Sequence, residues 1–318
     1  MAATRRLSTA AEACTELLTR FGSTSKPIST RTQLLDANQL HLLSLTLNRP
    51  SSSPDPPKNG TPIPPGHHLV YFTPAVPTSS LGLDGTDTVV NPLAPFTRRM
   101  WAGGHLTWSP STPLLVGQTV RETTRLISAE PKRLKTGDEM LLVGVEKTYS
   151  PSDSPDAVAL TDRRNWVFRR EIDPSSSVPV PPRPEEVPLP SPPTGGWARD
   201  FTQSEVSLFR FSALTFNGHK IHYSDEWCRG VEGHRRAVVH GPLNLINMLN
   251  FWGDEVGGGR MPRGVEYRAV RPIYVGERYR VLLKDGGKGK GGEEGDGRWE
   301  VEVWDSFGGV GMRGVVWG

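Results

Sequence analysis

The sequence has no uninterrupted apolar run of about 18 residues, the length at which a membrane-spanning helix would be predicted. It contains two cysteines, Cys14 and Cys228, too few for a disulfide framework or a four-cysteine zinc site. It also lacks a strong excess of charge of one sign, because 37 Lys and Arg residues balance 34 Asp and Glu residues to a net charge of +3. Composition therefore gives no case for a nucleic-acid binder, since such proteins concentrate basic charge.

The chain does have enough apolar residues for a sizeable core. Residues of the types AVILMFWYC make up 36% of its 318 positions, and 34 further positions are glycine. These shares are typical of globular proteins. Since domains contain about 100–200 residues, the length indicates two domains or one large one.

The amino-terminal segment, residues 1–25, has features of a mitochondrial leader. It combines arginines with Ser, Thr and Ala, and apolar residues fall at helical spacing around Leu17 and Phe21, as in transit peptides. Glu12 and Glu16 are unusual there, because transit peptides avoid acidic residues. We therefore expect a mitochondrial location and keep a cytoplasmic or peroxisomal one as the alternative. The arginines are Arg5, Arg6 and Arg20.

Proline divides the rest of the chain into two parts of similar length. Residues 173–196 contain nine prolines, a composition typical of an extended linker. One unit is therefore expected at 26–172 and another at 197–318. Both contain a common pattern, because residues 113–120 and 272–279 read Pro, two apolar residues, Val, Gly, a polar residue and then the start of a strand. This repetition predicts an internal duplication.

The second half shows the clearer pattern of secondary structure. Pro242 suits the first position of a helix, and Gly241 suits the cap before it. Apolar residues then recur at i, i+3, i+4 and i+7, which predicts a helix with one face in the core. Strand-like segments follow, among them residues 299–304, which alternate strictly. The arrangement is α+β. The apolar residues of the helix are Leu245, Met248, Leu249 and Trp252.

Residues suited to proton chemistry gather between positions 215 and 242. Four of the eight histidines lie there, and imidazole exchanges protons near neutral pH. The Gly241 amide, at the positive end of the expected helix, is able to stabilise an oxyanion on a carbonyl. Such a pair suits chemistry beside a thioester. The alternative is that these histidines are structural residues without a catalytic role and that Gly241 only caps the helix. The four histidines are His219, His222, His234 and His240.

Three segments resemble the MaoC-like hydratases and dehydratases of the hotdog superfamily. Residues 214–223 read Leu-Thr-Phe-Asn-Gly-His-Lys-Ile-His-Tyr, residues 239–241 read Val-His-Gly, and residues 98–104 read Arg-Arg-Met-Trp-Ala-Gly-Gly. They are similar in particular to the double-hotdog group that contains hydroxyacyl-thioester dehydratase type 2 and the mesaconyl- and itaconyl-CoA hydratases. The resemblance extends over about residues 90–317.

The resemblance implies an α+β double-hotdog fold, with two curved antiparallel sheets that are each wrapped around a central helix. The unit at 26–172 is expected to be a degenerate hotdog, because residues 50–90 read as loops where an active motif would lie. The unit at 197–318 is expected to be the catalytic hotdog, with one competent site built on residues 212–242. Such a pseudo-dimer can act as a monomer, and a homo-oligomer stays an alternative.

The resemblance also implies an activity, the reversible dehydration of a (3R)-hydroxyacyl thioester to the trans-2-enoyl thioester. The substrate is expected to be an acyl-CoA or an acyl carrier protein thioester, and a leader would place the reaction in mitochondrial fatty-acid synthesis. No metal ion or redox cofactor is implied.

His222 falls on the catalytic histidine of the family motif and is expected to transfer the proton. Asn217 occupies the position of the family's aspartate; because it cannot accept a proton, it is expected only to orient the water or hydroxyl. The Gly241 amide is expected to polarise the thioester carbonyl. The residues expected to contact the substrate are His219, His240, Arg98, Arg99 and Trp101.

Other functions stay open beside this one. The first is a hydratase for C5-dicarboxylyl-CoA substrates, mesaconyl-CoA or itaconyl-CoA. The second is a non-catalytic acyl-thioester binding protein, which the missing aspartate at position 217 and the degenerate first half would explain. A hotdog thioesterase is a further alternative, which Asn217 disfavours because it supplies no carboxylate.

Overall fold

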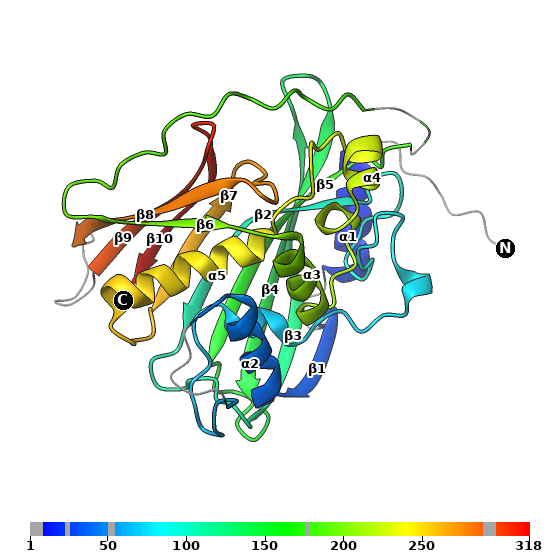
Figure 1. The fold of residues 1–318 in the computed structure, drawn as a ribbon. Helices are drawn as coiled ribbons and strands as arrows, with labels where there is room; N and C mark the ends of the chain where they lie inside the picture. Colours follow the sequence, from blue (N-terminus) through cyan, green and yellow to red (C-terminus); the bar gives the residue numbers. More distant parts are fainter. Residues whose placement is uncertain (1–8, 23–25, 50–54, 174, 176–177, 289–296) are drawn as a thin grey trace.

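The computed structural model describes residues 9–22, 26–49, 55–173, 175, 178–288 and 297–318. Residues 1–8 and 23–25 of the expected leader lie outside this part of the chain. In the described part, ten strands form one antiparallel sheet in the order β1-β3-β4-β5-β2-β7-β10-β9-β8-β6 (Figure 1). The strands are β1 Ser29–Leu34, β2 Arg98–Trp108, β3 Thr119–Arg133, β4 Glu139–Pro151, β5 Leu160–Arg169, β6 Trp197–Thr202, β7 Gly264–Ala269, β8 Arg278–Lys288, β9 Gly297–Asp305 and β10 Val310–Trp317.

The two halves share this sheet through β2 and β7, which pair antiparallel from Gly103 opposite Arg268 to Thr107 opposite Gly264. The expectation of two separate sheets is therefore corrected. Each half ends in a strand whose outer edge would otherwise be unpaired, and joining the two edges satisfies both sets of backbone groups.

The strand order confirms the predicted duplication. The first half runs first, third, fourth, fifth and second strand, and the second half repeats that order as β6-β8-β9-β10-β7. The repeated sequence pattern lies before the third strand of each half. Gly117 and Gly276 in that pattern both adopt a positive φ, +83° and +77°, in a turn that favours glycine.

Helix α5, Gly241–Trp252, is the predicted core helix and packs against β8, β9 and β10 (Figure 1). Pro242 lies in its first turn, where its missing N–H costs no hydrogen bond. Leu245, Met248 and Trp252 are almost completely buried, as their spacing predicts.

The interior of the first half is built differently. Helix α2, Ala37–Thr46, begins at Asp36, whose side chain accepts the N–H of Gln39, and it packs on α3, Glu205–Leu214, and on the short helix at His67–Val70. Its buried residues join those of α5 in one apolar core that spans both halves.

The inner face of the first-half strands, which bears Tyr149, changes character along its length. Side chains two positions apart share a face of a strand, so Tyr149, Lys147 and Val145 follow one another on this face. Tyr149 belongs to the main core and Val145 to a second apolar cluster. Lys147 lies between them and pairs with Glu122, with an Nζ–Oε2 distance of 2.9 Å. A charged band therefore crosses this face; it consists of Glu122, Lys147, Asp162 and Arg164.

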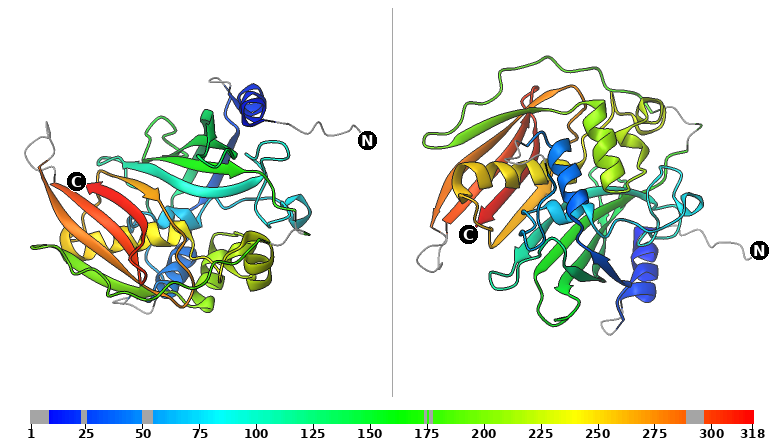
Figure 2. Two further views of the ribbon diagram at one scale, coloured as in Figure 1. Left: turned by 90° about the horizontal axis from the view of Figure 1, so that it is seen from above. Right: turned by 60° about the horizontal axis from the view of Figure 1, so that its bottom comes forward.

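Helix α1, Ala10–Phe21, packs on β3 and β4 and covers the second apolar cluster. Thr9 and Glu12 cap it through reciprocal hydrogen bonds. Figure 2 shows α1 beside the strands of the first half, well separated from α5. This ordered helix lies within the segment whose sequence resembles a leader.

The proline-rich residues 178–196 form neither helix nor strand and pass over the second half before entering β6 (Figure 1). One backbone bond ties them down midway, from the Val187 N–H to the Ser306 carbonyl. Among the helices of the described residues, none has the length and hydropathy needed to cross a membrane.

Candidate active site

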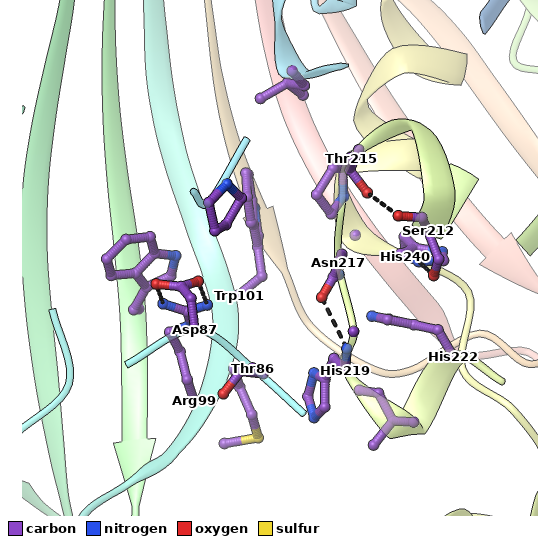
Figure 3. Close-up of a pocket in the computed structure, with 18 of the residues that line it drawn as sticks. Thr86, Asp87, Arg99, Trp101, Ser212, Thr215, Asn217, His219, His222 and His240 are labelled. Atoms are coloured by element: carbon purple, nitrogen blue, oxygen red, sulfur yellow. Dashed lines mark hydrogen bonds and ion pairs between the residues drawn. The ribbon is translucent and has the colours of Figure 1, made fainter. Parts of the chain in front are cut away.

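A cavity of about 1180 Å³ lies between the two halves, and both contribute to its wall. The second half supplies the turn after α3 and the start of α5, and the first half supplies β2 and the loop before it (Figure 3). Of the predicted site residues, all but one line this cavity: Arg99, Trp101, Asn217, His219, His222, His240 and Gly241.

Arg98 is the exception. Its guanidinium pairs with the buried carboxylate of Glu232. Arg99 does reach the cavity, but it pairs with Asp87, with an Nη2–Oδ2 distance of 2.6 Å, and lies over the Trp166 ring. The structure therefore gives Arg98 a structural ion pair and leaves Arg99 at the cavity with its charge balanced.

The turn after α3 brings two histidines into the cavity wall. Phe216 adopts a φ of +49°, which reverses the chain, and Asn217 Oδ1 accepts the N–H of His219 at 3.1 Å. Asn residues stabilise turns in this way. One short helical turn, Lys220–His222, then carries His222 to the cavity.

His222 has one ring nitrogen fixed by the backbone. Its Nδ1 lies 2.7 Å from the Val238 carbonyl oxygen, which can only accept, so Nδ1 carries the hydrogen and Nε2 keeps a free lone pair. Burial lowers the pKa of His222 to about 4. The ring is therefore neutral at neutral pH, with Nε2 available as a base.

His240 stacks on His222, with ring centroids 3.6 Å apart and planes inclined by 18°. Its Nε2 lies 2.9 Å from Ser212 Oγ, a hydroxyl on α3. Burial and the neighbouring rings of His222 and His219 keep the pKa of His240 well below its ordinary value. The stack fixes the plane of His222 and places His240 directly before α5.

Gly241 opens α5, where the first backbone N–H groups have no partner within the helix. It lies against the Trp101 ring, since a Cβ built on it would be 3.5 Å from two indole carbons. An acyl carbonyl near this end of α5 would meet amide donors and the positive end of the helix dipole. His222 and Gly241 thus combine a base and an amide donor in one cavity wall.

The opposite wall of the cavity includes part of the charged band. Glu122, Lys147 and Arg164 line it, and Arg164 is held by Asp162 at 2.6 Å. Arg31 also lines it and donates to the carbonyls of Phe72 and Thr73; among the described residues it pairs with no carboxylate. Among the described residues, the cavity lining contains seven Arg or Lys residues and two carboxylates. This excess of positive charge favours an anionic ligand.

Sequence reasoning missed two residues near the reacting groups. Asp84 lies beside His219, with Oδ2 3.8 Å from Nε2, and comes from a segment interpreted as loop. Asn244, on the face of α5 that lines the cavity, is buried and its Oδ1 has no partner in the described part of the chain. The apolar pattern of α5 gives a weak signal for Asn244, as a polar residue inside a buried helix; nothing local singles out Asp84.

The histidines do not form a metal site in this arrangement. No group of three or more His, Cys, Asp or Glu side chains in the described ranges is placed so that it could hold a metal ion.

Comparison with solved structures supports the fold. A MaoC-like dehydratase from Phytophthora capsici superposes with a TM-score of 0.64 at 14% identity, covering 92% of this chain and 95% of that one. A Mycobacterium tuberculosis protein described as a double hotdog superposes with a TM-score of 0.54 at 13% identity, covering 91% and 94%. The ten-stranded sheet is thus of the double-hotdog type.

Comparison with protein sequences gives the family. The mesaconyl-C(4)-CoA hydratase of Chloroflexus aurantiacus is 30% identical over 244 residues, 76% of this chain and 81% of the relative. The mitochondrial hydroxyacyl-thioester dehydratase type 2 of Schizosaccharomyces pombe is 26% identical over 252 residues, 71% and 79% of the two chains. The family model for hydroxyacyl-thioester dehydratase type 2 matches residues 66–275, which include β2, the four histidines that line the cavity and all of α5. The chain belongs to the hydroxyacyl-thioester dehydratase type 2 family.

Proposed function

We propose that the protein interconverts a (3R)-hydroxyacyl thioester and the trans-2-enoyl thioester, with His222 as the acid and base. The observation that carries this proposal is the lone pair on His222 Nε2, fixed by the 2.7 Å bond at Nδ1 and set in one cavity wall with the Gly241 amide. Family membership supports the reaction class.

In the dehydration direction, His222 Nε2 removes the proton from the carbon next to the thioester carbonyl. The electron pair moves into the carbonyl, and the Gly241 amide at the start of α5 stabilises the resulting enolate oxygen. The pair then returns to form the double bond as the hydroxyl leaves, and His222 gives its proton to that hydroxyl. One water leaves and His222 is neutral again.

Asn217 orients the leaving hydroxyl in this scheme, or the attacking water in reverse. Its Oδ1 already accepts the His219 N–H, so the amide NH₂ is the part that would donate a hydrogen bond to the substrate oxygen. His219, His240 and Trp101 would shape the cavity around the thioester, and Arg99 would meet the anionic part of the carrier.

A C5-dicarboxylyl-CoA hydratase is the second candidate, favoured by the excess of cationic side chains in the cavity lining. A second carboxylate at the end of the acyl group would find Arg31 free of a competing carboxylate among the described residues. A long fatty acyl chain would instead place methylene groups against Lys147 and Arg164, where it gains little from burial.

Mitochondria are the proposed setting. The arginine-rich amino-terminal residues support this location, as do the names of two yeast relatives of the family, both described as mitochondrial.

Hydration of crotonyl-CoA by the full-length protein tests the proposal, followed as loss of the enoyl-thioester absorbance. We expect His222→Ala to lower kcat by about 10²–10⁴-fold, the usual contribution of a general acid–base group. His41→Ala is the matched control, because His41 lies on α2 away from the cavity and should leave the rate unchanged. Full activity in His222→Ala would overturn the assigned role.

The same assay separates the candidate substrates. Faster hydration of mesaconyl-CoA than of crotonyl-CoA and longer enoyl-CoA substrates would favour the dicarboxylyl function. The reverse order of rates would favour the fatty-acyl function. Enoyl groups carried on acyl carrier protein identify the carrier. Binding of acyl-CoA without turnover of any of these thioesters would instead support a non-catalytic binding protein.

A further inference from the structure

The aspartate that the family motif places at position 217 is absent, yet a buried carboxylate lies directly behind His219, a residue of the cavity wall. It belongs to Asp84, which lies in the first-half loop before β2 and precedes His219 by 135 positions in the sequence. Asp84 Oδ2 lies 3.8 Å from His219 Nε2. This carboxylate reaches the site from the first half, whereas His219 belongs to the second.

Each of these two atoms is otherwise unused. Asp84 Oδ2 and His219 Nε2 are both buried, and neither has a hydrogen-bond partner among the described residues. Asp84 Oδ1, in contrast, accepts two bonds from Thr86, from its backbone N–H at 2.9 Å and from its hydroxyl at 2.8 Å. Those bonds fix the carboxylate so that its second oxygen is turned toward the imidazole.

The backbone holds the two segments together at this point. The Lys220 N–H donates to the Asp84 carbonyl at 2.8 Å. Gly85 adopts a φ of +84°, and a Cβ on it would lie 2.0 Å from the Gly218 carbonyl oxygen. A side chain at position 85 would therefore force the loop away from His219, so this approach depends on glycine.

We propose that Asp84 is a positioning residue for His219 and supplies, from the first half, the carboxylate that position 217 lacks. Its negative charge, 3.8 Å from Nε2, favours the hydrogen of His219 on Nε2 and thereby leaves a lone pair on Nδ1. His219 lines the cavity, so this lone pair holds the water in hydration, or the hydroxyl in dehydration. The proposal deepens the proposed function and rests on it for its catalytic consequence.

The arrangement assigns the two histidines complementary tautomers. His222 carries its hydrogen on Nδ1 because the Val238 carbonyl accepts there, and His219 carries its hydrogen on Nε2 because the charge of the Asp84 carboxylate lies on that side of the ring. Burial, His222 and the guanidinium of Arg99 keep the pKa of His219 well below its ordinary value, so the ring is neutral and carries a single N–H. No proton needs to reach Asp84 in the reaction; His222 still takes and returns the one proton that moves.

The first test reads the tautomer of His219 without any assay of activity. Nitrogen-15 NMR of the imidazoles in the full-length protein should show His219 with its hydrogen on Nε2. In Asp84→Asn, the amide NH₂ can donate to Nε2 and should move the hydrogen to Nδ1, while the signals of His222 stay in place. Asp156→Asn is the control, because Asp156 is an exposed aspartate of the same half. Wild-type protein with the hydrogen of His219 on Nδ1 would overturn the proposal, even if the Asp84 variant failed to fold.

The second test reads the consequence for turnover. We expect Asp84→Asn to lower kcat for crotonyl-CoA hydration by about 10²-fold with little change in KM, since Asp84 acts through His219 rather than on the substrate. In a His219→Gln background, Asp84→Asn should have almost no further effect, because the two residues act as a unit. Full additivity of the two substitutions, or an unchanged kcat in Asp84→Asn, would exclude the positioning role.

The two tests fail separately. If the wild-type protein turns over none of the thioesters but Asp84→Asn changes the tautomer of His219, the Asp84–His219 interaction is supported and the proposed function is wrong. If the thioesters are turned over but Asp84→Asn leaves the tautomer of His219 unchanged, the proposed function is supported and the positioning role of Asp84 is wrong.

Discussion

The two halves of this protein repeat one strand order, but the inner faces of their strands carry different side chains. In the second half, the strands pack on α5, whose Leu245, Met248 and Trp252 are buried in the apolar core. In the first half, the charged band of Glu122, Lys147, Asp162 and Arg164 crosses the inner face, and part of it lines the cavity. Duplication has kept the hydrogen-bonded frame, and the side chains upon it have diverged.

Because of this difference, the two halves contribute different parts of the site. The second half holds the reacting groups, because the Val238 carbonyl and the His240 ring orient His222, and Gly241 begins α5. The first half supplies the opposite wall, with a loop that reaches His219 and a face able to meet charge. A single apolar core across both halves keeps the two contributions in register.

The largest change in stability is expected from breaking the charged band. Asp162 is fully buried and binds Arg164 at 2.6 Å and His68 at 3.3 Å. Asp162→Ala leaves the Arg164 guanidinium buried without its carboxylate, so we expect the free energy of unfolding to fall by about 3–5 kcal/mol, measured by urea denaturation at pH 7. Glu130→Ala, which removes the exposed Lys132 pair of the same half, should cost at most about 1 kcal/mol.

The pH dependence sharpens this prediction. Burial alone would raise the pKa of Asp162, but Arg164 and His68 outweigh it and hold the pKa below its ordinary value. A depressed pKa contributes stability that is complete above the unfolded value of about 4 and is lost as the pH falls below it. The difference between wild type and Asp162→Ala should therefore shrink below about pH 4. A difference that stays constant down to pH 3 would show that the lost contact is not ionic.

In the second half, we expect stability to depend on apolar packing rather than on buried charge. Leu245 is completely buried on α5, so Leu245→Ala should lower the free energy of unfolding by about 2–5 kcal/mol. The loss should be the same at pH 7 and pH 4, because no ionisable group is involved. Leu83→Ala, at a largely exposed leucine, should change it by less than about 0.5 kcal/mol. A pH-dependent loss in Leu245→Ala would erase the proposed contrast between the halves.

Features that depend on neighbouring residues could be predicted from the sequence. The spacing of apolar residues predicted α5, and the Pro-Gly pattern before the third strand of each half predicted the duplication that the strand order confirms. The histidines that line the cavity lie within 22 positions of one another, so one short segment of the sequence indicated all four: His219, His222, His234 and His240.

Features that depend on distant pairing could not. Glu122, Lys147 and Asp162 alternate with other residues as on a solvent-facing strand, and only the pairing of β3, β4 and β5 shows that they meet in the interior. The joining of β2 to β7 likewise depends on which edges are left unpaired after each half folds. Asp84 sits in a glycine-containing stretch that locally indicates a turn, and its meaning appears only when Gly218 packs against Gly85.

The smallest expected effect compares the helices that meet where the halves join. Asp36 caps α2 in the first half by accepting the Gln39 N–H at 2.8 Å, and Ser204 caps α3 in the second half through reciprocal bonds with Ser207. Asp36→Ala and Ser204→Ala should each lower the free energy of unfolding by about 1 kcal/mol, since each leaves backbone N–H groups uncapped. Because α2 and α3 pack on each other within the shared core, we expect the double variant to lose less than the sum of the two. Urea denaturation of the three variants measures the difference, and strict additivity would mean that the caps of the two halves act independently.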